Sequence, residues 1–325
     1  MTRFGYTLMT EQSGPKDLVR YASAAEDAGF DLLVSSDHYF PWLSAQGHAP
    51  YAWTVLGAVA QVTQQIELMT YVTCPTMRYH PAVVAQKAAT LQILADGRFT
   101  LGLGAGENLN EHVIGEGWPP VAVRHEMLAE AVQIIRELLR GDGYTTFHGE
   151  YYDVDGGKIW DLPEGGVPIG LAVSGEKSVE LAAQYADVLI ATEPKPELTE
   201  QFEAAGGGGK KKVGQMPISY GTDKAAAVTR AHELFRWFGL GWKVNADLPG
   251  TAGFDAASQF VREEDVESSL PCGDDVDAVI EAAKEYADAG FTHLALVQIG
   301  GDQQAPYLAW SEKTLMPAWR EAFGS

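Results

Sequence analysis

Short apolar runs alternate with longer amphipathic runs along nearly the whole of this chain. The apolar runs have strand length and cover residues 4–8, 31–36, 66–73, 98–103, 168–173, 187–191, 216–221 and 292–299. Patterns of helical period lie between and after them, near residues 15–29, 52–64, 81–94, 124–140, 176–186, 223–236, 274–289 and 307–322. Such alternation implies parallel strands joined by right-handed crossovers. Eight such units close into a (β/α)8 TIM barrel better than they fill an open sheet.

The length of the chain leaves its domain count open, because 325 residues suffice for one barrel or for two smaller domains. The continuous alternation favours a single barrel domain over residues 1–325. Segments 141–165, 193–213 and 238–272 do not fit the repeat, so we expect them to be insertions. The phrases AAEDAGFDLLV and AKEYADAGFTHLAL each lead from a helix into a strand, and we expect Gly29 and Gly290 to end those helices.

The charge balance excludes some classes of partner. The chain has 23 Lys and Arg against 44 Asp and Glu, a net charge of −21. Nonspecific binding of nucleic acid or of an anionic membrane needs a net basic face, so neither is expected, although a local phosphate site remains open. Cys74 and Cys272 match no disulfide framework or metal-ligand spacing, and neither a basic leader nor a membrane-length apolar run is present. We therefore expect a cytoplasmic protein that binds a small-molecule substrate and no metal.

The best candidates for chemistry follow the first two strands, because active sites of barrels lie at the C-terminal ends of strands. His38 lies in SDHYFPW after the second strand and is a candidate general base, although a histidine hydrogen-bonded within a loop fits as well. Trp42 in the same stretch suits either the core or a ligand site. Glu11 after the first strand would orient the His38 imidazole or be a solvated acid.

Glycines follow the fourth strand in GLGAGEN and would let backbone approach a ligand, with Glu107 at the barrel mouth. A dinucleotide fingerprint is rejected here, because the acidic residue that should end a second strand about 20 positions later is missing. Ser174 and Gly175 open a helix and form either an anion site or a plain cap made by Ser174. The run 206–212, GGGGKKK, is expected to be a flexible lid or loop.

Several stretches together resemble a known family. They are SDHYFPW, GHAPYAW, TCPTMRYHPAVVAQ, GRFTLGLGAGENLNE, GEYYDV, GGVPIGLAVSG and DAGFTHLAL. The chain resembles the bacterial luciferase-like superfamily, in particular the branch that uses the deazaflavin coenzyme F420 and its glucose-6-phosphate dehydrogenase group. The resemblance covers nearly the whole chain and weakens between residues 195 and 272. It implies a luciferase-like TIM barrel, coenzyme F420 as cofactor and a homodimer.

The resemblance also implies roles for individual residues. His38 would take the hydroxyl proton of the substrate, Glu11 would support it, and Trp42 would line the reaction centre. Glu107 would give a proton to a nitrogen of the deazaflavin as hydride arrives on its C5. The implied cofactor-binding residues are Asp37, Thr70, Val72, Cys74, Gly106, Glu107, Asn110, Ser174 and Gly175. A cis peptide bond at Tyr71–Val72 is implied as well.

The implied substrate site is incomplete. Thr192, Lys195 and Lys243 match positions that hold the phosphate in the sugar-phosphate dehydrogenases, although exposed lysines are often only solvated. An arginine of that site has no counterpart in VESSLPCGDD, where Ser268 or its neighbours stand. Arginine binds phosphate through two parallel hydrogen bonds, so its loss should weaken the binding of a phosphosugar.

Three functions remain open from the sequence. The first is an F420-dependent oxidoreductase acting on an alcohol or a sugar-type substrate. The second is an FMN-dependent monooxygenase of the same superfamily, and the third is a deazaflavin-binding protein without turnover.

Overall fold

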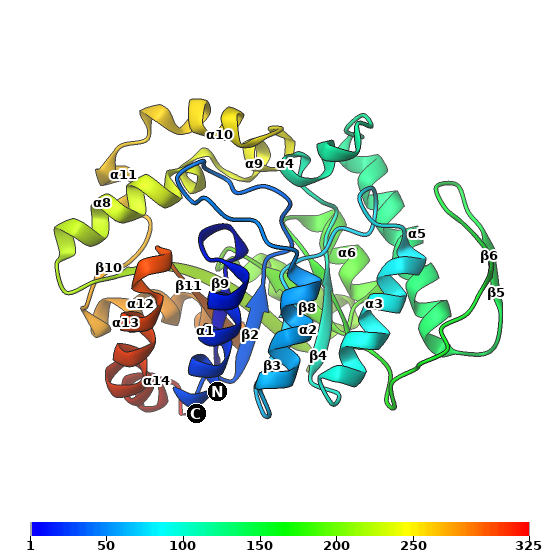
Figure 1. The fold of residues 1–325 in the computed structure, drawn as a ribbon, viewed down its shortest axis with the longest axis horizontal. Helices are drawn as coiled ribbons and strands as arrows, with labels where there is room; N and C mark the ends of the chain where they lie inside the picture. Colours follow the sequence, from blue (N-terminus) through cyan, green and yellow to red (C-terminus); the bar gives the residue numbers. More distant parts are fainter. Residues whose placement is uncertain (1, 325) are drawn as a thin grey trace.

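Eight parallel strands close into a barrel in this protein, whose computed structural model describes residues 2–324 (Figure 1). In ring order the strands are β1 (Arg3–Leu8), β2 (Leu32–Ser35), β3 (Glu67–Thr70), β4 (Phe99–Leu103), β7 (Ile169–Ala172), β8 (Val188–Ala191), β9 (Lys211–Tyr220) and β11 (His293–Gln298). The β8–β9 and β11–β1 pairs complete the ring, and all its pairs are parallel. The predicted (β/α)8 TIM barrel is confirmed.

Helices follow the strands in the predicted order and surround the barrel (Figure 1). Their bounds are α1 (Pro15–Asp27), α2 (Ala52–Val62), α3 (Pro81–Leu94), α5 (Val121–Arg140), α6 (Glu176–Tyr185), α8 (Lys224–Phe235), α12 (Val276–Asp288), α13 (Gln304–Trp310) and α14 (Met316–Phe323). Gly29 and Gly290 follow α1 and α12 with φ of 90° and 88°, which confirms them as the glycines that end these helices. None of the helices among residues 2–324 is both long and apolar enough to cross a membrane.

Two of the expected insertions are extra elements. Segment 141–165 holds a hairpin of β5 (Thr145–His148) and β6 (Asp153–Gly157), which projects at the right of Figure 1. Segment 238–272 holds the short helices α9 (Trp242–Asp247), α10 (Thr251–Ala257) and α11 (Glu263–Glu267), and leads into β10 (Cys272–Gly273) beside β9. Helices α8 to α11 arch over the top of the barrel in Figure 1.

The third expected insertion, 193–213, is partly wrong. It holds α7 (Pro196–Phe202), but β9 already begins at Lys211 and pairs with β8. The Gly206–Lys212 run is therefore no lid, because it leads into the N-terminal end of a barrel strand. Active sites of barrels lie at the opposite end, where the strands finish. The start of this strand was not recognised in the sequence, because its first two residues are lysines. Their charges are paired only in the folded protein. Lys211 Nζ lies 2.5 Å from Glu67, and Lys212 contacts Glu203.

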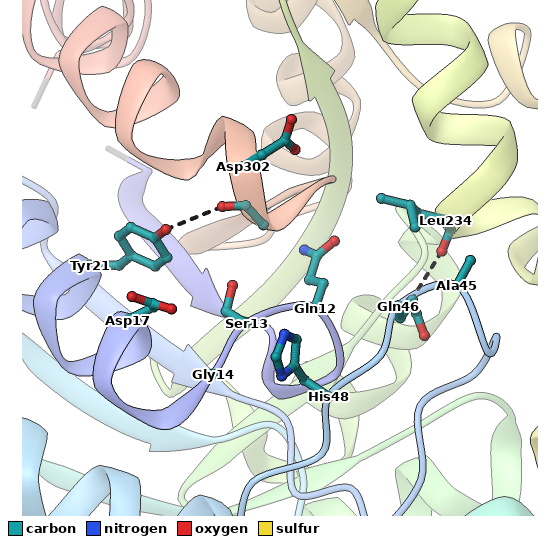
Figure 2. Close-up of a pocket in the computed structure, with 11 residues that line it drawn as sticks. Gln12, Ser13, Gly14, Asp17, Tyr21, Ala45, Gln46, His48, Leu234 and Asp302 are labelled. Atoms are coloured by element: carbon teal, nitrogen blue, oxygen red, sulfur yellow. Dashed lines mark hydrogen bonds between the residues drawn. The ribbon is translucent and has the colours of Figure 1, made fainter.

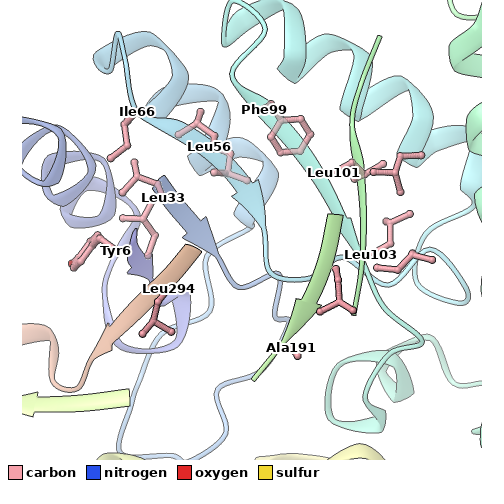
Figure 3. Close-up of a cluster of buried hydrophobic side chains, with 14 of the residues drawn as sticks. Tyr6, Leu33, Leu56, Ile66, Phe99, Leu101, Leu103, Ala191 and Leu294 are labelled. Atoms are coloured by element: carbon pink, nitrogen blue, oxygen red, sulfur yellow. The ribbon is translucent and has the colours of Figure 1, made fainter. Parts of the chain in front are cut away.

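The strands have two buried faces. Side chains that point into the barrel form one cluster of Leu32, Val34, Met69, Val188, Ile190, Val213 and Ala295. Alternate residues point outward, so Leu33 and Leu294 join a second cluster that includes Leu56 of α2 (Figure 3). Burial of each such leucine contributes about 1.5–3 kcal/mol. Because all strands are parallel, the loops after β1, β2, β3, β4, β7 and β8 share one end of the barrel, which we call the mouth.

We expect Gly102→Ala to destabilise the protein, because the barrel wall has no room for a side chain at this position. A Cβ on Gly102 would lie 1.9 Å from the backbone oxygen of Thr70. Overpacking of this kind costs about 1–3 kcal/mol or more. Gly57→Ala in α2 is the matched control, since a Cβ there meets nothing within 4 Å and alanine favours a helix. The midpoint of urea unfolding should fall for Gly102→Ala only; equal midpoints would contradict this packing argument.

Candidate active site

His38 lies between two carboxyl groups that come from different strand ends. Its Nδ1 is 3.1 Å from Oε1 of Glu11, which follows β1, and its Nε2 is 3.4 Å from Oε2 of Glu107, which follows β4. The approach at Nδ1 is a close contact between carboxyl and imidazole that lacks hydrogen-bond geometry. The structure thus brings three of the predicted site residues together at the mouth. Their chemical roles stay predictions.

Glu11 is buried and is held through its second carboxyl oxygen. Its Oε2 accepts hydrogen bonds from Ser36 Oγ at 2.6 Å and from Thr10 Oγ1 at 3.2 Å. These bonds fix the carboxylate while Oε1 faces the imidazole. A fixed carboxylate beside a histidine orients the ring and balances its charge when it takes up a proton.

Glu107 is held less tightly than Glu11 and precedes the short helix α4 (Asn108–Glu111). Its Oε2 accepts a hydrogen bond from Asn110 Nδ2 at 3.2 Å. Burial raises the pKa of Glu107 to about 7, and His38 opposes this shift while Glu11 and Glu111 add to it. Both protonation states are therefore populated near neutral pH, as suits a group that gives and takes a proton.

An aromatic wall stands beside the imidazole. The rings of His38 and Trp42 have centroids 5.2 Å apart, and Trp42 stacks on Trp237 at 4.0 Å with an interplanar angle of 4°. Phe254 of α10 meets Trp42 edge-on at 5.0 Å. Trp237 lies in the turn Arg236–Leu240 at the start of the 238–272 insertion, so this insertion covers the mouth with apolar surface. Exclusion of water strengthens the charge contacts beneath it.

Two predicted cofactor residues are buried and already engaged with the protein. Asp37 has no exposed side-chain surface and accepts hydrogen bonds from Trp53 Nε1 at 3.1 Å and Thr73 Oγ1 at 2.7 Å. The Thr70 hydroxyl donates to the backbone oxygen of Gly102 at 2.8 Å and accepts from its N–H at 2.9 Å. Their predicted contact with a cofactor stays a prediction. The two side chains hold the C-terminal ends of β2 and β3 to neighbouring segments.

Cys74 and Asn110 are buried as well. The Cys74 Sγ lies 3.0 Å from Thr76 Oγ1, and burial raises the pKa of its thiol far above the ordinary value, so it stays a neutral thiol. The Asn110 Oδ1 accepts hydrogen bonds from the backbone N–H of Tyr39 at 2.9 Å and of Phe40 at 3.3 Å. Asn110 thereby ties α4 to the loop that carries His38.

The remaining predicted cofactor residues keep accessible surface. Val72 and Gly106 are partly exposed in the loops after β3 and β4, and the Tyr71–Val72 peptide bond is cis, as the resemblance implies. These loops touch closely, because a Cβ on Gly104 would lie 2.7 Å from Val72 Cγ2. Together they present a wall of backbone and small side chains.

Ser174 and Gly175 open α6, but the expected alternative of a cap made by Ser174 is wrong. Gly175 is the N-cap residue, and the Ser178 hydroxyl accepts hydrogen bonds from the backbone N–H groups of Ser174 at 3.0 Å and Gly175 at 3.1 Å. The Ser174 side chain is exposed. The start of α6 therefore keeps accessible surface at Ser174 and Gly175.

The predicted substrate residues lie in two separate segments. Thr192 and Lys195 are exposed in the loop after β8, and Lys243 is exposed on α9. Lys195 Nζ lies 2.7 Å from Glu193 Oε2, so its charge is already balanced. Ser268 ends α11 and is exposed.

Sequence reasoning missed two charged residues of the site. Arg78 and Glu111 are buried beside Asp37 and beneath the loops that carry His38 and Glu107. The signal was an arginine in TMRYHP, within the loop after the third strand, and a glutamate in GENLNE. Neither residue forms a recognisable spacing with the other, so only the fold reveals the pair.

A separate polar hollow of about 260 Å³ lies beside the turn that carries Glu11 (Figure 2). Its lining includes Gln12, Gln46 and His48. Gln12 donates to the backbone oxygen of Gln298 at 2.7 Å, and Gln46 donates to that of Leu234 at 3.0 Å. Both amides are therefore engaged in holding loops together, and none of the predicted site residues lines this hollow.

Comparison with known proteins identifies the family of this chain. Residues 1–293 match the family described as luciferase-like monooxygenase. The F420-dependent glucose-6-phosphate dehydrogenase of Nakamurella multipartita is 38% identical, over 99% of this chain and 98% of that protein. The protein of the same name from Rhodococcus hoagii is 36% identical, over 98% of each chain.

A solved structure is similar over the full length. It is an F420-dependent secondary alcohol dehydrogenase in complex with an F420–acetone adduct, which superposes with a TM-score of 0.89 at 28% identity. The superposition covers 98% of this chain and 99% of that one. The chain therefore belongs to the luciferase-like family and, within it, to the group that contains the F420-dependent dehydrogenases.

Proposed function

We propose that this protein is an F420-dependent oxidoreductase that transfers a hydride between the deazaflavin and an alcohol or sugar-type substrate. The observation that carries the proposal is the placement of His38 between the carboxyl groups of Glu11 and Glu107 at the barrel mouth. The names of its relatives, an alcohol dehydrogenase and sugar-phosphate dehydrogenases that use F420, support it.

The residues at the mouth fit such a cofactor. Gly104 and Gly106 lie against Val72 and Cys74 so closely that added Cβ atoms would approach these side chains to 2.7 and 2.5 Å. The resulting flat wall suits a planar ring system. A Cβ on Gly175 would meet nothing within 4 Å, so the N-terminus of α6 has room for an anionic group and a dipole that favours it.

Two residues of the chain each carry out one proton transfer. When bound, the deazaflavin supplies the carbon that accepts or gives the hydride. His38 takes the proton of the substrate hydroxyl, while Glu11 balances the imidazolium that results. Glu107, protonated in part at neutral pH, gives its proton on the cofactor side. Trp42 and the wall behind it exclude water and hold the reactants in place.

The substrate site supports an alcohol better than a sugar phosphate. Lys195 is paired with Glu193, and no arginine stands near Ser268 in the sequence VESSLPCGDD. Phosphate recognition is therefore expected to be weaker than in the glucose-6-phosphate dehydrogenases. The two cysteines are free thiols, in keeping with a cytoplasmic location.

We expect His38→Ala to lower turnover by about 10²–10⁴-fold, because the substrate proton loses its acceptor. Binding of F420, followed by fluorescence titration, should be nearly unchanged. His148→Ala in the β5–β6 hairpin is the control, since this histidine is exposed and paired with Asp153. Turnover is measured as bleaching of oxidised F420 with a panel of alcohols and sugar phosphates.

The same titration, repeated with FMN, separates the competing functions. Preference for FMN would assign the protein to the oxygen-using monooxygenases. Binding of F420 without turnover of any alcohol or sugar would assign it to cofactor storage. Unchanged turnover in His38→Ala would contradict the role given to this residue.

We expect alcohol oxidation to decline as pH rises through about 7, because Glu107, whose pKa is raised to about 7, must be protonated to act as the acid. Glu107→Gln should lower the rate and remove this pH limb. Because the pKa of Glu107 is raised in the folded protein, stability is lost as the pH rises from the ordinary glutamate pKa of 4.5 to about 7, and the full loss is present above pH 7. At pH 8 the free energy of unfolding of the variant should therefore exceed that of the wild type by up to about 3 kcal/mol. Its melting temperature should be higher accordingly. A lower melting temperature would contradict the electrostatic argument, and exposed Glu200→Gln is the control.

We also propose that the protein is a homodimer that pairs through α2 and α3. The two helices lie side by side, and Gln61 Nε2 donates a 3.0 Å hydrogen bond across them to the backbone oxygen of Leu94. Their exposed apolar residues are Val62, Val83, Ile93 and Leu94. An apolar groove of about 390 Å³ lies on the other side of α2, between α1 and α2. Apolar surface of this kind on an otherwise acidic chain is typical of a protein interface.

Light scattering tests the homodimer. Ile93→Glu should convert the dimer to a monomer, because a charge would be buried without a partner. Phe260→Glu, which changes an exposed aromatic residue in the 238–272 insertion, should leave the mass unchanged. A monomeric wild type would refute this interface.

A further inference from the structure

Arg78 joins the two loops that carry His38 and Glu107. It lies in the loop after β3, and β3 lies between β2 and β4 in the barrel. Its Nη2 donates a 2.8 Å hydrogen bond to the backbone oxygen of Asp37 and lies 3.4 Å from Asp37 Oδ1. Because Asp37 directly precedes His38, this contact holds the backbone on one side of the imidazole.

The same arginine also holds α4. Oε2 of Glu111 accepts a 2.8 Å hydrogen bond from the Arg78 backbone N–H, and its Oε1 lies 3.4 Å from Arg78 Nε. The side chains of Asp37, Arg78 and Glu111 are 0%, 8% and 1% exposed. A buried charge that loses its partner is strongly destabilised, so these contacts are costly to break.

Asn110 makes the complementary tie on the other side of His38. Its Oδ1 accepts the backbone N–H groups of Tyr39 and Phe40, while its Nδ2 donates to Glu107. The loop is therefore held to α4 both before and after His38. Through these contacts the separation between His38 and Glu107 depends on how α4 and the loop are docked.

We propose that Arg78 is a positioning residue, which clamps the 36–42 loop to α4 and thereby sets the distance between His38 and Glu107. The inference rests on the proposed function, because those two residues transfer the protons there. A lysine cannot replace Arg78, since one ammonium group does not reach Asp37 and Glu111 together with the geometry of a planar fork. Arg78 itself does not touch the reacting atoms.

An arginine at the opposite end of the barrel is the control that distinguishes positioning of the site from a purely structural role. Arg98 donates to the backbone oxygens of Ile66 at 2.7 Å and Thr63 at 3.0 Å, just before β3 and β4 begin. It thus ties the start of β4 to the start of β3, at the end of the barrel opposite the mouth. Arg98→Lys should lower stability and leave the kinetics of the site unchanged.

The kinetic test compares Arg78→Lys with Arg98→Lys well below their melting temperatures. We expect kcat of Arg78→Lys to fall by at least about tenfold, since small displacements of reacting groups have large effects on rate. KM for the alcohol should stay within about threefold, because the clamp does not touch the substrate. Equal kcat values for Arg78→Lys and the wild type, or the same loss in Arg98→Lys, would overturn the proposal.

Hydrogen exchange provides a readout that needs no turnover. The amides of Tyr39 and Phe40 donate to Asn110, so their exchange reports directly on the contact between the loop and α4. Both should exchange faster in Arg78→Lys than in Arg98→Lys and the wild type. If Arg78→Lys does not fold, Glu111→Gln carries both tests, with smaller changes in the same direction.

The two readouts separate this proposal from the proposed function. Unchanged exchange at residues 39 and 40 would overturn the clamp, whatever the activity of the wild type. A wild type that never reduces F420, together with faster exchange in Arg78→Lys, would overturn the proposed function and support the clamp.

Discussion

Closure of the barrel through the β8–β9 and β11–β1 pairs is the constraint on which the site depends. Glu11 follows β1 and Glu107 follows β4, three strands apart in ring order. In a flat sheet such strands would lie about 14 Å apart. Curvature of the closed ring turns their loops toward a common axis, so both carboxyl groups reach one imidazole, that of His38.

The mouth gathers more negative than positive charge, and the fold treats each carboxyl group differently. Asp37 and Glu111 share Arg78, and Glu11 is held by two hydroxyl groups. Glu107 has one amide donor besides the contact with His38. Burial therefore acts on Glu107 with little compensation and raises its pKa to about 7. Of these carboxyl groups, Glu107 has the fewest hydrogen-bond donors, and its pKa lies closest to neutral pH.

Much of the fold could be predicted, because the spacing of apolar residues that distinguishes strands from helices is a property of the local sequence alone. The start of β9 escaped this reasoning, since Lys211 and Lys212 look like a solvated run until Glu67 and Glu203 are seen beside them. Burial of Asp37 and Thr70 escaped it as well. Resemblance places these residues near a cofactor, but their exposure is decided by neighbours from other strands.

The sequence by itself determined the alternation of strands and helices and the positions of His38 and Glu107 after the second and fourth strands. These follow from periodicity and from motifs next to strand ends, which are local properties. Only the tertiary structure decided that Glu11 and Glu107 face opposite nitrogens of His38, and that Arg78 ties their loops together. Such contacts join residues distant in the chain, so their distances and burial depend on how the whole ring closes.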